Sequence, residues 1–326
     1  MEQVEFTDRN ALKLQLKPPH FKRSYGVVYT YTSGSKEDTV KFDLDVTYVK
    51  TIIDRSRIFK LERTSPVYVN DIAPDLVADQ LAYECGKVFY PLQLEIGFDG
   101  SYMGVFNHQE ILSRWKDTRS SVEEYFKGET TEKYLQLMEL SLSSQEKVDL
   151  IFRDELFCSV FFSPVYRAYG ENFVVETHST FPIGGRCAPV KFKGIAEVNP
   201  LLNAAGHIEI HHIGEADDER TAGDLKEEQS FPIERLMNPE ATPVRGDYTI
   251  RLVLEKETRS IRSLVGRWKL ELGEVQETEL KIFEWLEDED QQEILQENVR
   301  KGMVFLDGNH EPREKKITNP FKFLWD

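Results

Sequence analysis

The feature that most constrains the fold of this chain is a period-two alternation of apolar and polar residues. Between residues 40 and 48 the even positions are apolar (Val, Phe, Leu, Val, Tyr) and the odd positions are Lys, Asp, Asp and Thr. Because successive side chains of a strand point to opposite faces, this pattern predicts a strand with one buried face. The same pattern recurs in residues 88–96, 190–198, 248–254, 268–272 and 280–282.

Strands with one polar face are typical of antiparallel sheets, because parallel sheets are covered on both faces. Short loops at Ser33–Ser35 and Phe98–Gly100 predict hairpins, and so does the pair Gly184–Gly185. A phosphate-binding loop is the alternative for the glycine pair, but it needs a following helix and usually a lysine. The sequence therefore predicts an α+β fold of mainly antiparallel curved sheet packed with helices, arranged either as two lobes or as one sheet around the helices.

Helical patterns gather in the first half of the chain. Pro74–Cys85 has a proline at its start and Gly86 at its end, and Thr131–Leu142 carries an apolar stripe. Capping patterns at Asn107-x-x-Glu110 and Ser143-x-x-Glu146 predict the starts of two more helices. A last helix is expected near Asp290–Lys301.

These elements predict three consecutive segments. Residues 1–165 form an N-terminal α+β lobe, residues 166–286 a strand-rich C-terminal lobe, and residues 287–326 an acidic helix with an aromatic tail. Within the second lobe, the polar stretch Gly214–Phe231 has few apolar residues and is expected to be a long loop or mobile insertion.

Charge and composition narrow the classes of partner. The formal net charge is −16, from 57 acidic and 41 basic residues, which disfavours binding to nucleic acid and to anionic membranes and favours basic partners. No stretch approaches the ~20 apolar residues of a transmembrane helix, so no membrane insertion is expected. Three scattered cysteines (Cys85, Cys158 and Cys187) and the absence of a secretory leader indicate a cytoplasmic protein.

Motifs for catalysis are missing. The sequence contains no GxSxG elbow, no GxGxxG dinucleotide motif and no Cys–His signature. An enzyme is therefore not favoured, and no cofactor is predicted.

One segment has the residue types of a metal site. On a strand, His207, Glu209 and His211 would share one face, and two imidazoles with a carboxylate could bind zinc or ferrous iron. The alternative is that Ile208 and Ile210 pack inward and the three polar residues are the solvent face of an ordinary strand.

Two aromatic features point to binding. Tyr25, Tyr29 and Tyr31 share one face of an early predicted strand, where they would line an apolar cavity or pack the core. The chain also ends on large apolar side chains that dock either on its own body or on a partner. These side chains are Phe321, Phe323, Leu324 and Trp325.

The sequence therefore favours a non-catalytic binding or assembly protein, such as an adaptor, a chaperone-like protein or an immunity-type partner, with a protein partner or self-association. The alternative function is a carrier of a small apolar ligand in a curved-sheet cavity. A metal-dependent enzyme using the His-x-Glu-x-His strand is the third hypothesis.

The block Tyr90–Trp115 reads as strand, Asp-Gly turn, strand and helix. It resembles a block in uncharacterised soluble proteins of Bacteroidota, some of them in secretion-related gene neighbourhoods. The resemblance implies a bacterial cytosolic protein and carries no catalytic assignment.

Overall fold

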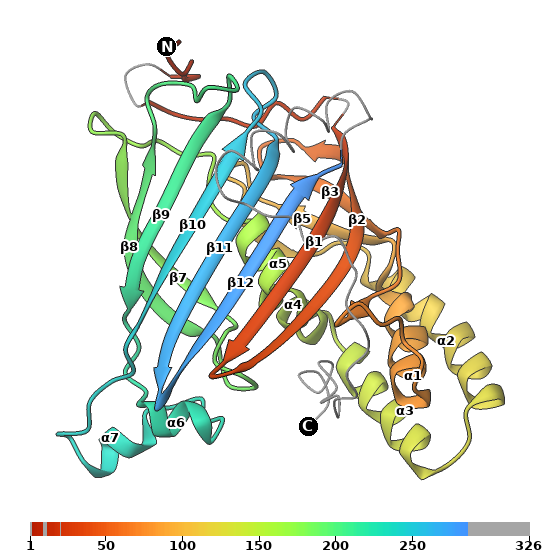
Figure 1. The fold of residues 1–326 in the computed structure, drawn as a ribbon. Helices are drawn as coiled ribbons and strands as arrows, with labels where there is room; N and C mark the ends of the chain where they lie inside the picture. The colour runs from red at the N-terminus through yellow and green to blue at the C-terminus, as the bar shows by residue number, and fades with distance from the viewer. Residues whose placement is uncertain (1, 9–11, 20, 286–326) are drawn as a thin grey trace.

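Twelve antiparallel strands form one curved sheet in the computed structural model, which describes residues 2–8, 12–19 and 21–285 (Figure 1). The strand order is β6-β5-β3-β2-β1-β12-β11-β10-β9-β8-β7, and β4 pairs with β2. The strands are β1 (Lys22–Ser33), β2 (Lys36–Ile52), β3 (Ser56–Arg63), β4 (Tyr68–Val69), β5 (Leu92–Ile96), β6 (Tyr102–Val105), β7 (Val174–Phe181), β8 (Val190–Val198), β9 (Ile208–Ala216), β10 (Gly246–Leu254), β11 (Ile261–Leu272) and β12 (Glu274–Glu284).

The first and last strands lie side by side in the middle of the sheet. β1 pairs with β12, with Tyr25 opposite Glu284, and on its other side with β2, with Tyr25 opposite Leu44. In Figure 1 the red β1 therefore runs next to the blue β12. Strands from both predicted lobes belong to this one sheet, and the expected boundary at residue 165 does not interrupt it.

The helices are α1 (Val77–Gly86), α2 (His108–Tyr125), α3 (Glu129–Leu142), α4 (Gln145–Arg153), α5 (Leu156–Phe161), α6 (Ala222–Lys226) and α7 (Ile233–Met237), with a 3₁₀ turn, η1 (Lys87–Phe89). Figure 1 shows α4 and α5 inside the curve of the sheet, α1 to α3 gathered beyond it on one side, and α6 and α7 below the ends of β11 and β12. No helix in the described ranges is long and apolar enough to pass through a lipid bilayer.

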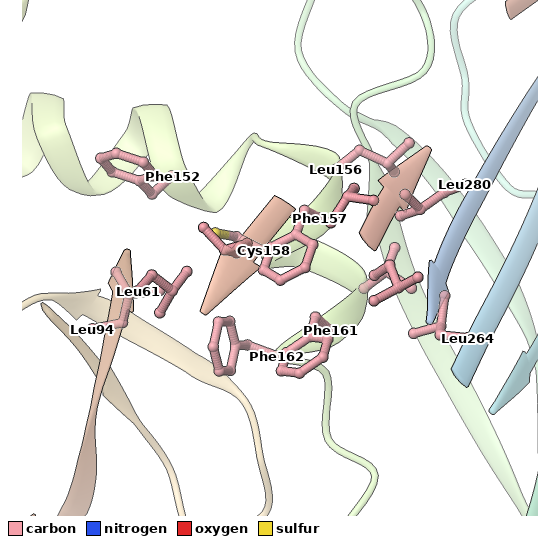
Figure 2. Packing of buried hydrophobic residues seen from close by; sticks show 14 of the residues in the cluster. Leu61, Leu94, Phe152, Leu156, Phe157, Cys158, Phe161, Phe162, Leu264 and Leu280 are labelled. Atoms are coloured by element: carbon pink, nitrogen blue, oxygen red, sulfur yellow. The ribbon is translucent and has the colours of Figure 1, made fainter. Parts of the chain in front are cut away.

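The core is centred on α5, whose aromatic side chains fill the concave side of the sheet. Figure 2 shows Phe157, Phe161 and Phe162 between leucines of β3 and β5 on one side and leucines of β11 and β12 on the other. The rings of Phe157 and Phe161 stack at 4.9 Å, and Phe161 also meets Tyr25 of β1 at 5.2 Å. A short helix thus joins the two halves of the sheet, because each half buries its apolar face against it.

The predicted alternation is confirmed in β2, β8, β10, β11 and β12, and it fails at one place. Val88 to Tyr90 was expected to begin a strand, but this part is the 3₁₀ turn η1 followed by Pro91, and the strand starts at Leu92. Val88 and Phe89 are nevertheless buried. Apolar residues at that spacing also fit a short helical turn packed on the core, so the pattern alone did not separate the two structures.

The expectation of a long loop or mobile insertion at Gly214–Phe231 is wrong. β9 extends to Ala216, and the helix α6 follows, capped by Thr221 with its side chain bonded to the backbone N–H of Asp224. Before it, the buried Arg220 donates from Nε to Asp218 Oδ1 at 2.9 Å and from Nη1 to the carbonyl of Ala188 at 2.8 Å. The buried residues of this segment are therefore polar, and their burial is tolerated because they form hydrogen bonds with one another.

The helices start close to the predicted positions, with different caps. The side chain of Ser144, and not that of Ser143, caps α4 by accepting a hydrogen bond from the backbone N–H of Lys147. Asn107 stands before α2, but its Oδ1 accepts from the N–H of Gln93 at 2.9 Å and so ties the helix to β5. The three predicted hairpins are present as β1–β2, β5–β6 and β7–β8. The predicted helix at 290–301 lies outside the described residues.

Candidate functional site

A cavity of about 520 Å³ lies between the concave face of the sheet and the helices. Its walls come from β1, β2, β3 and β5, from α1, α3, α4 and α5, and from the β7–β8 hairpin. The volume falls within the roughly 300–1,000 Å³ typical of small-molecule sites. It is the candidate site because protein interiors otherwise leave few voids larger than a water molecule.

Aromatic and aliphatic side chains make the sheet wall. Tyr29 and Tyr31 of β1 stack with parallel rings 6.2 Å apart, and Phe42 of β2 lies 6.1 Å from Tyr29. Leu44 and Leu61, on β2 and β3, are fully buried below them. The inward positions of three adjacent strands therefore present one continuous apolar surface to the cavity.

The helix wall is apolar as well. Ala82 and Tyr83 come from α1, Met138 from α3, and Ile151 and Phe152 from α4. Ala82, Met138 and Phe152 are buried, so these helices turn their apolar stripes towards the cavity and the core beside it. A ligand in the cavity would contact mainly carbon atoms on both sides.

Glu155, the N-cap of α5, brings a hydrogen-bonded carboxylate to the cavity wall. Its Oε2 accepts from the backbone N–H of Cys158 at 2.8 Å, and its Oε1 accepts from the hydroxyl of Tyr29 at 2.6 Å. Burial, together with the charge of Glu155, raises the pKa of Tyr29 well above its ordinary value. The tyrosine therefore remains a neutral donor at physiological pH.

Arg63, at the end of β3, brings a cation to the same wall. Its guanidinium carbon lies 4.6 Å from the ring centre of Tyr90 and 5.4 Å from that of Phe42. Its Nη2 donates to the hydroxyl of Tyr90 at 3.2 Å. Burial raises the pKa of Tyr90, and the nearby Arg63 acts in the opposite direction. Both aromatic partners of Arg63 also line the cavity.

Two of the three tyrosines singled out in the sequence line this cavity, and one does not. Tyr29 and Tyr31 are in its wall, whereas Tyr25 is fully buried in the core, where its hydroxyl donates to the carbonyl of Ile261 at 2.6 Å. Tyr25 lies four residues before Tyr29, about 13 Å along the strand. Residues on the same face of β1 therefore do not all line the cavity.

Sequence reasoning missed the polar residues of the cavity. Arg63 and Glu155 are far apart in the sequence and belong to no motif. The only available signal was that Arg63 falls on the same strand face as Leu61, a position that β3 directs inward.

The His-x-Glu-x-His segment is engaged in other contacts. Ile208 and Ile210 are buried, as the alternative to the metal site expected, and the Glu209 carboxylate accepts from Asn203 at 3.0 Å and pairs with Arg251. Burial acts to raise the pKa of Glu209, but these hydrogen bonds lower it overall. His211 Nε2 lies 3.6 Å from Glu209 Oε2, and His207 Nε2 lies 3.4 Å from Arg262 Nη1. Among the described residues, no group of three or more His, Cys, Asp or Glu side chains is arranged to hold a metal ion.

The apolar chain end predicted to bind a partner, with Phe321, Phe323, Leu324 and Trp325, lies outside the described residues. That expectation stays a prediction.

The chain matches no protein-family model and no curated protein sequence. Among solved structures it is similar to a lipovitellin structure described by its lipid–protein interactions, with a TM-score of 0.43 and 9% sequence identity. The likeness covers 81% of this chain and 25% of the lipovitellin chain, so this chain spans about a quarter of that protein. A likeness of this strength carries no functional argument. The resemblance of Tyr90–Trp115 to proteins of Bacteroidota stays a prediction.

Proposed function

We propose that this protein binds a small, largely apolar ligand in the cavity between its curved sheet and its helices. The observation that carries the proposal is the cavity itself, about 520 Å³ in volume with mainly aromatic and aliphatic walls. The charged side chains in its lining are Arg63, Asp154, Glu155 and Arg186. An apolar site with a few placed polar groups is the usual composition of a ligand pocket.

The side chains that line this cavity have packing partners on only one side. A ligand that fills the space adds contacts on the other side and removes apolar surface from water, at about 25 cal/mol per Å². The walls therefore favour a hydrocarbon-rich occupant over water.

A titration with Nile red, a neutral dye that fluoresces in apolar surroundings, tests the proposal. The variant Ala82→Phe places a ring into the cavity from α1, where Ala82 is buried in the wall. The matched control Ala78→Phe carries the same change on an exposed position of the same helix.

We expect saturable dye binding by the wild type and by Ala78→Phe, and binding at least tenfold weaker in Ala82→Phe. Equal binding by all three proteins would place the dye elsewhere and contradict the proposal. Absence of saturable binding by the wild type would contradict it too. Native mass spectrometry after gentle purification gives a second readout: an adduct on the protein is expected, and only apoprotein would count against a carrier.

The sequence also predicts a protein-binding function through its last residues, and this remains a separate hypothesis. It is motivated by the apolar run 321–325 and by the net charge of −16, which favours a basic partner. Deleting residues 319–326 should change the oligomeric mass measured by light scattering or the capture of a partner. An unchanged mass together with unchanged capture would argue against it.

A further inference from the structure

Arg63 is a cation in the mainly apolar cavity wall, and most of its N–H donors form no hydrogen bond among the described residues. A guanidinium has five N–H donors. Within the described residues, its one hydrogen bond is to the hydroxyl of Tyr90, and its Nε is buried without an acceptor. No acidic side chain in these residues forms an ion pair with it.

The two aromatic rings hold this cation in place. The ring of Tyr90 lies 4.6 Å from the guanidinium carbon and that of Phe42 lies 5.4 Å from it. Stacking of this kind stabilises a guanidinium and keeps its planar fork ordered, but it supplies no hydrogen-bond acceptor. A carboxylate is complementary to an ordered guanidinium with free N–H donors, because it accepts two parallel hydrogen bonds from that group.

The acidic side chains in the cavity wall are already satisfied by other groups. Glu155 accepts from the Tyr29 hydroxyl and from the N–H of Cys158. Asp154 accepts two hydrogen bonds from Arg153, at 2.8 and 3.2 Å. Neither is available to Arg63 without losing these donors, so the charge of Arg63 is left for a ligand.

We propose that the ligand is an amphiphile with a carboxylate head group, which Arg63 binds while the hydrocarbon chain fills the cavity. This inference rests on the proposed function and adds the chemical class of the ligand. The second arginine of the wall, Arg186, already has Glu228 Oε1 at 3.7 Å from its Nε. One guanidinium without an ion pair among the described residues suits a singly charged head group better than a doubly charged one.

A competition experiment separates the head group from the chain. Dodecanoate and dodecanol have the same hydrocarbon chain and differ in charge, and each is used to displace Nile red at mildly alkaline pH. The variant Arg63→Met keeps an unbranched side chain between the two rings and removes the charge and the donors. Arg63→Lys keeps the charge and loses the planar fork.

The matched control is Arg267→Met, which makes the same change in net charge on an arginine of β11 that is exposed and paired with Glu279. Thermal unfolding of each variant establishes that it is folded before binding is measured.

In the wild type and in Arg267→Met we expect dodecanoate to bind more tightly than dodecanol. In Arg63→Met we expect the affinity for dodecanoate to fall about tenfold or more, with that for dodecanol within about threefold of the wild type, because a hydrogen bond to a charged group is lost. Arg63→Lys should lie between the two.

Two results would overturn the inference in distinguishable ways. In one, Arg63→Met loses the same affinity for dodecanoate as for dodecanol, or the wild type shows no preference for dodecanoate. This result would contradict the role of Arg63 but would remain consistent with a carrier of apolar ligands. Failure of the wild type to bind Nile red and both amphiphiles would remove the proposed function and this inference together.

Discussion

Acidification should destabilise this protein through one buried histidine, His212. It lies on β9 with its side chain on the buried face, between Ala196 of β8 and Ile250 of β10, and is 6% exposed. Its Nε2 is buried without a hydrogen-bond partner. Burial, together with the nearby charges of Arg167 and His211, lowers the pKa of His212 from 6.5 to about 4.

The magnitude follows from the two pKa values. The unfolded chain takes up a proton at His212 near pH 6.5, whereas the folded protein resists it until about pH 4. The contribution of His212 to the free energy of unfolding is therefore fully present above pH 6.5. It decreases as the pH drops towards 4, because the unfolded state binds more protons than the folded state in this range. At about pH 5, proton binding at His212 favours the unfolded state over the folded state by a factor of roughly 30. This factor corresponds to a decrease of about 2 kcal/mol in the free energy of unfolding.

Urea unfolding of the wild type and of His212→Leu, each at about pH 7.5 and about pH 5, isolates this contribution. The wild type should lose about 2 kcal/mol more between the two conditions than the variant does. Carboxylates titrate in both proteins, so their effect cancels in the difference. The control His178→Leu, on an exposed position of β7, should keep the full loss. Equal losses in the wild type and His212→Leu would refute the reasoning.

Three further predictions concern the interactions that hold the site in place, each measured by chemical denaturation. Arg220→Met leaves the buried Asp218 carboxylate unpaired and should cost about 3–5 kcal/mol; a cost below about 1 kcal/mol would contradict the burial of this pair. Phe161→Ala removes a ring between the two halves of the sheet and should cost about 3–5 kcal/mol, and a near-neutral effect would contradict the central position of α5. Tyr29→Phe removes a hydrogen bond to the N-cap carboxylate of α5 and should cost about 1–3 kcal/mol; Tyr31→Phe, which has no such bond among the described residues, should cost less, and the reverse order would be inconsistent with the structure.

The sequence predicted the sheet well because alternation is a local property. In β2, for example, every second residue from Val40 to Tyr48 is apolar, and the strand directs these residues to the concave side. The prediction failed where a different local structure uses the same spacing, as at Val88–Phe89, and where polar residues bury one another, as Asp218 and Arg220 do. In both places tertiary contacts decided the structure.

The cavity could be predicted only in part, because it depends on how distant segments meet. The face carrying Tyr29 and Tyr31 is visible in the sequence, but the bond from Tyr29 joins it to Glu155, 126 residues further along the chain. Arg63 became notable only when the fold placed Tyr90 and Phe42 beside it. Alternation cannot say which part of an apolar face is filled by core side chains, as at Tyr25, and which part is left open.

The most direct test of the cavity as a ligand site is anomalous diffraction from crystals of the protein with ω-bromododecanoic acid. One bromine peak is predicted among the apolar residues of the cavity wall, with the carboxylate of the same molecule at Arg63. A bromine peak on the outer face of the sheet, or no peak in crystals of a protein that binds the acid in solution, would contradict the account.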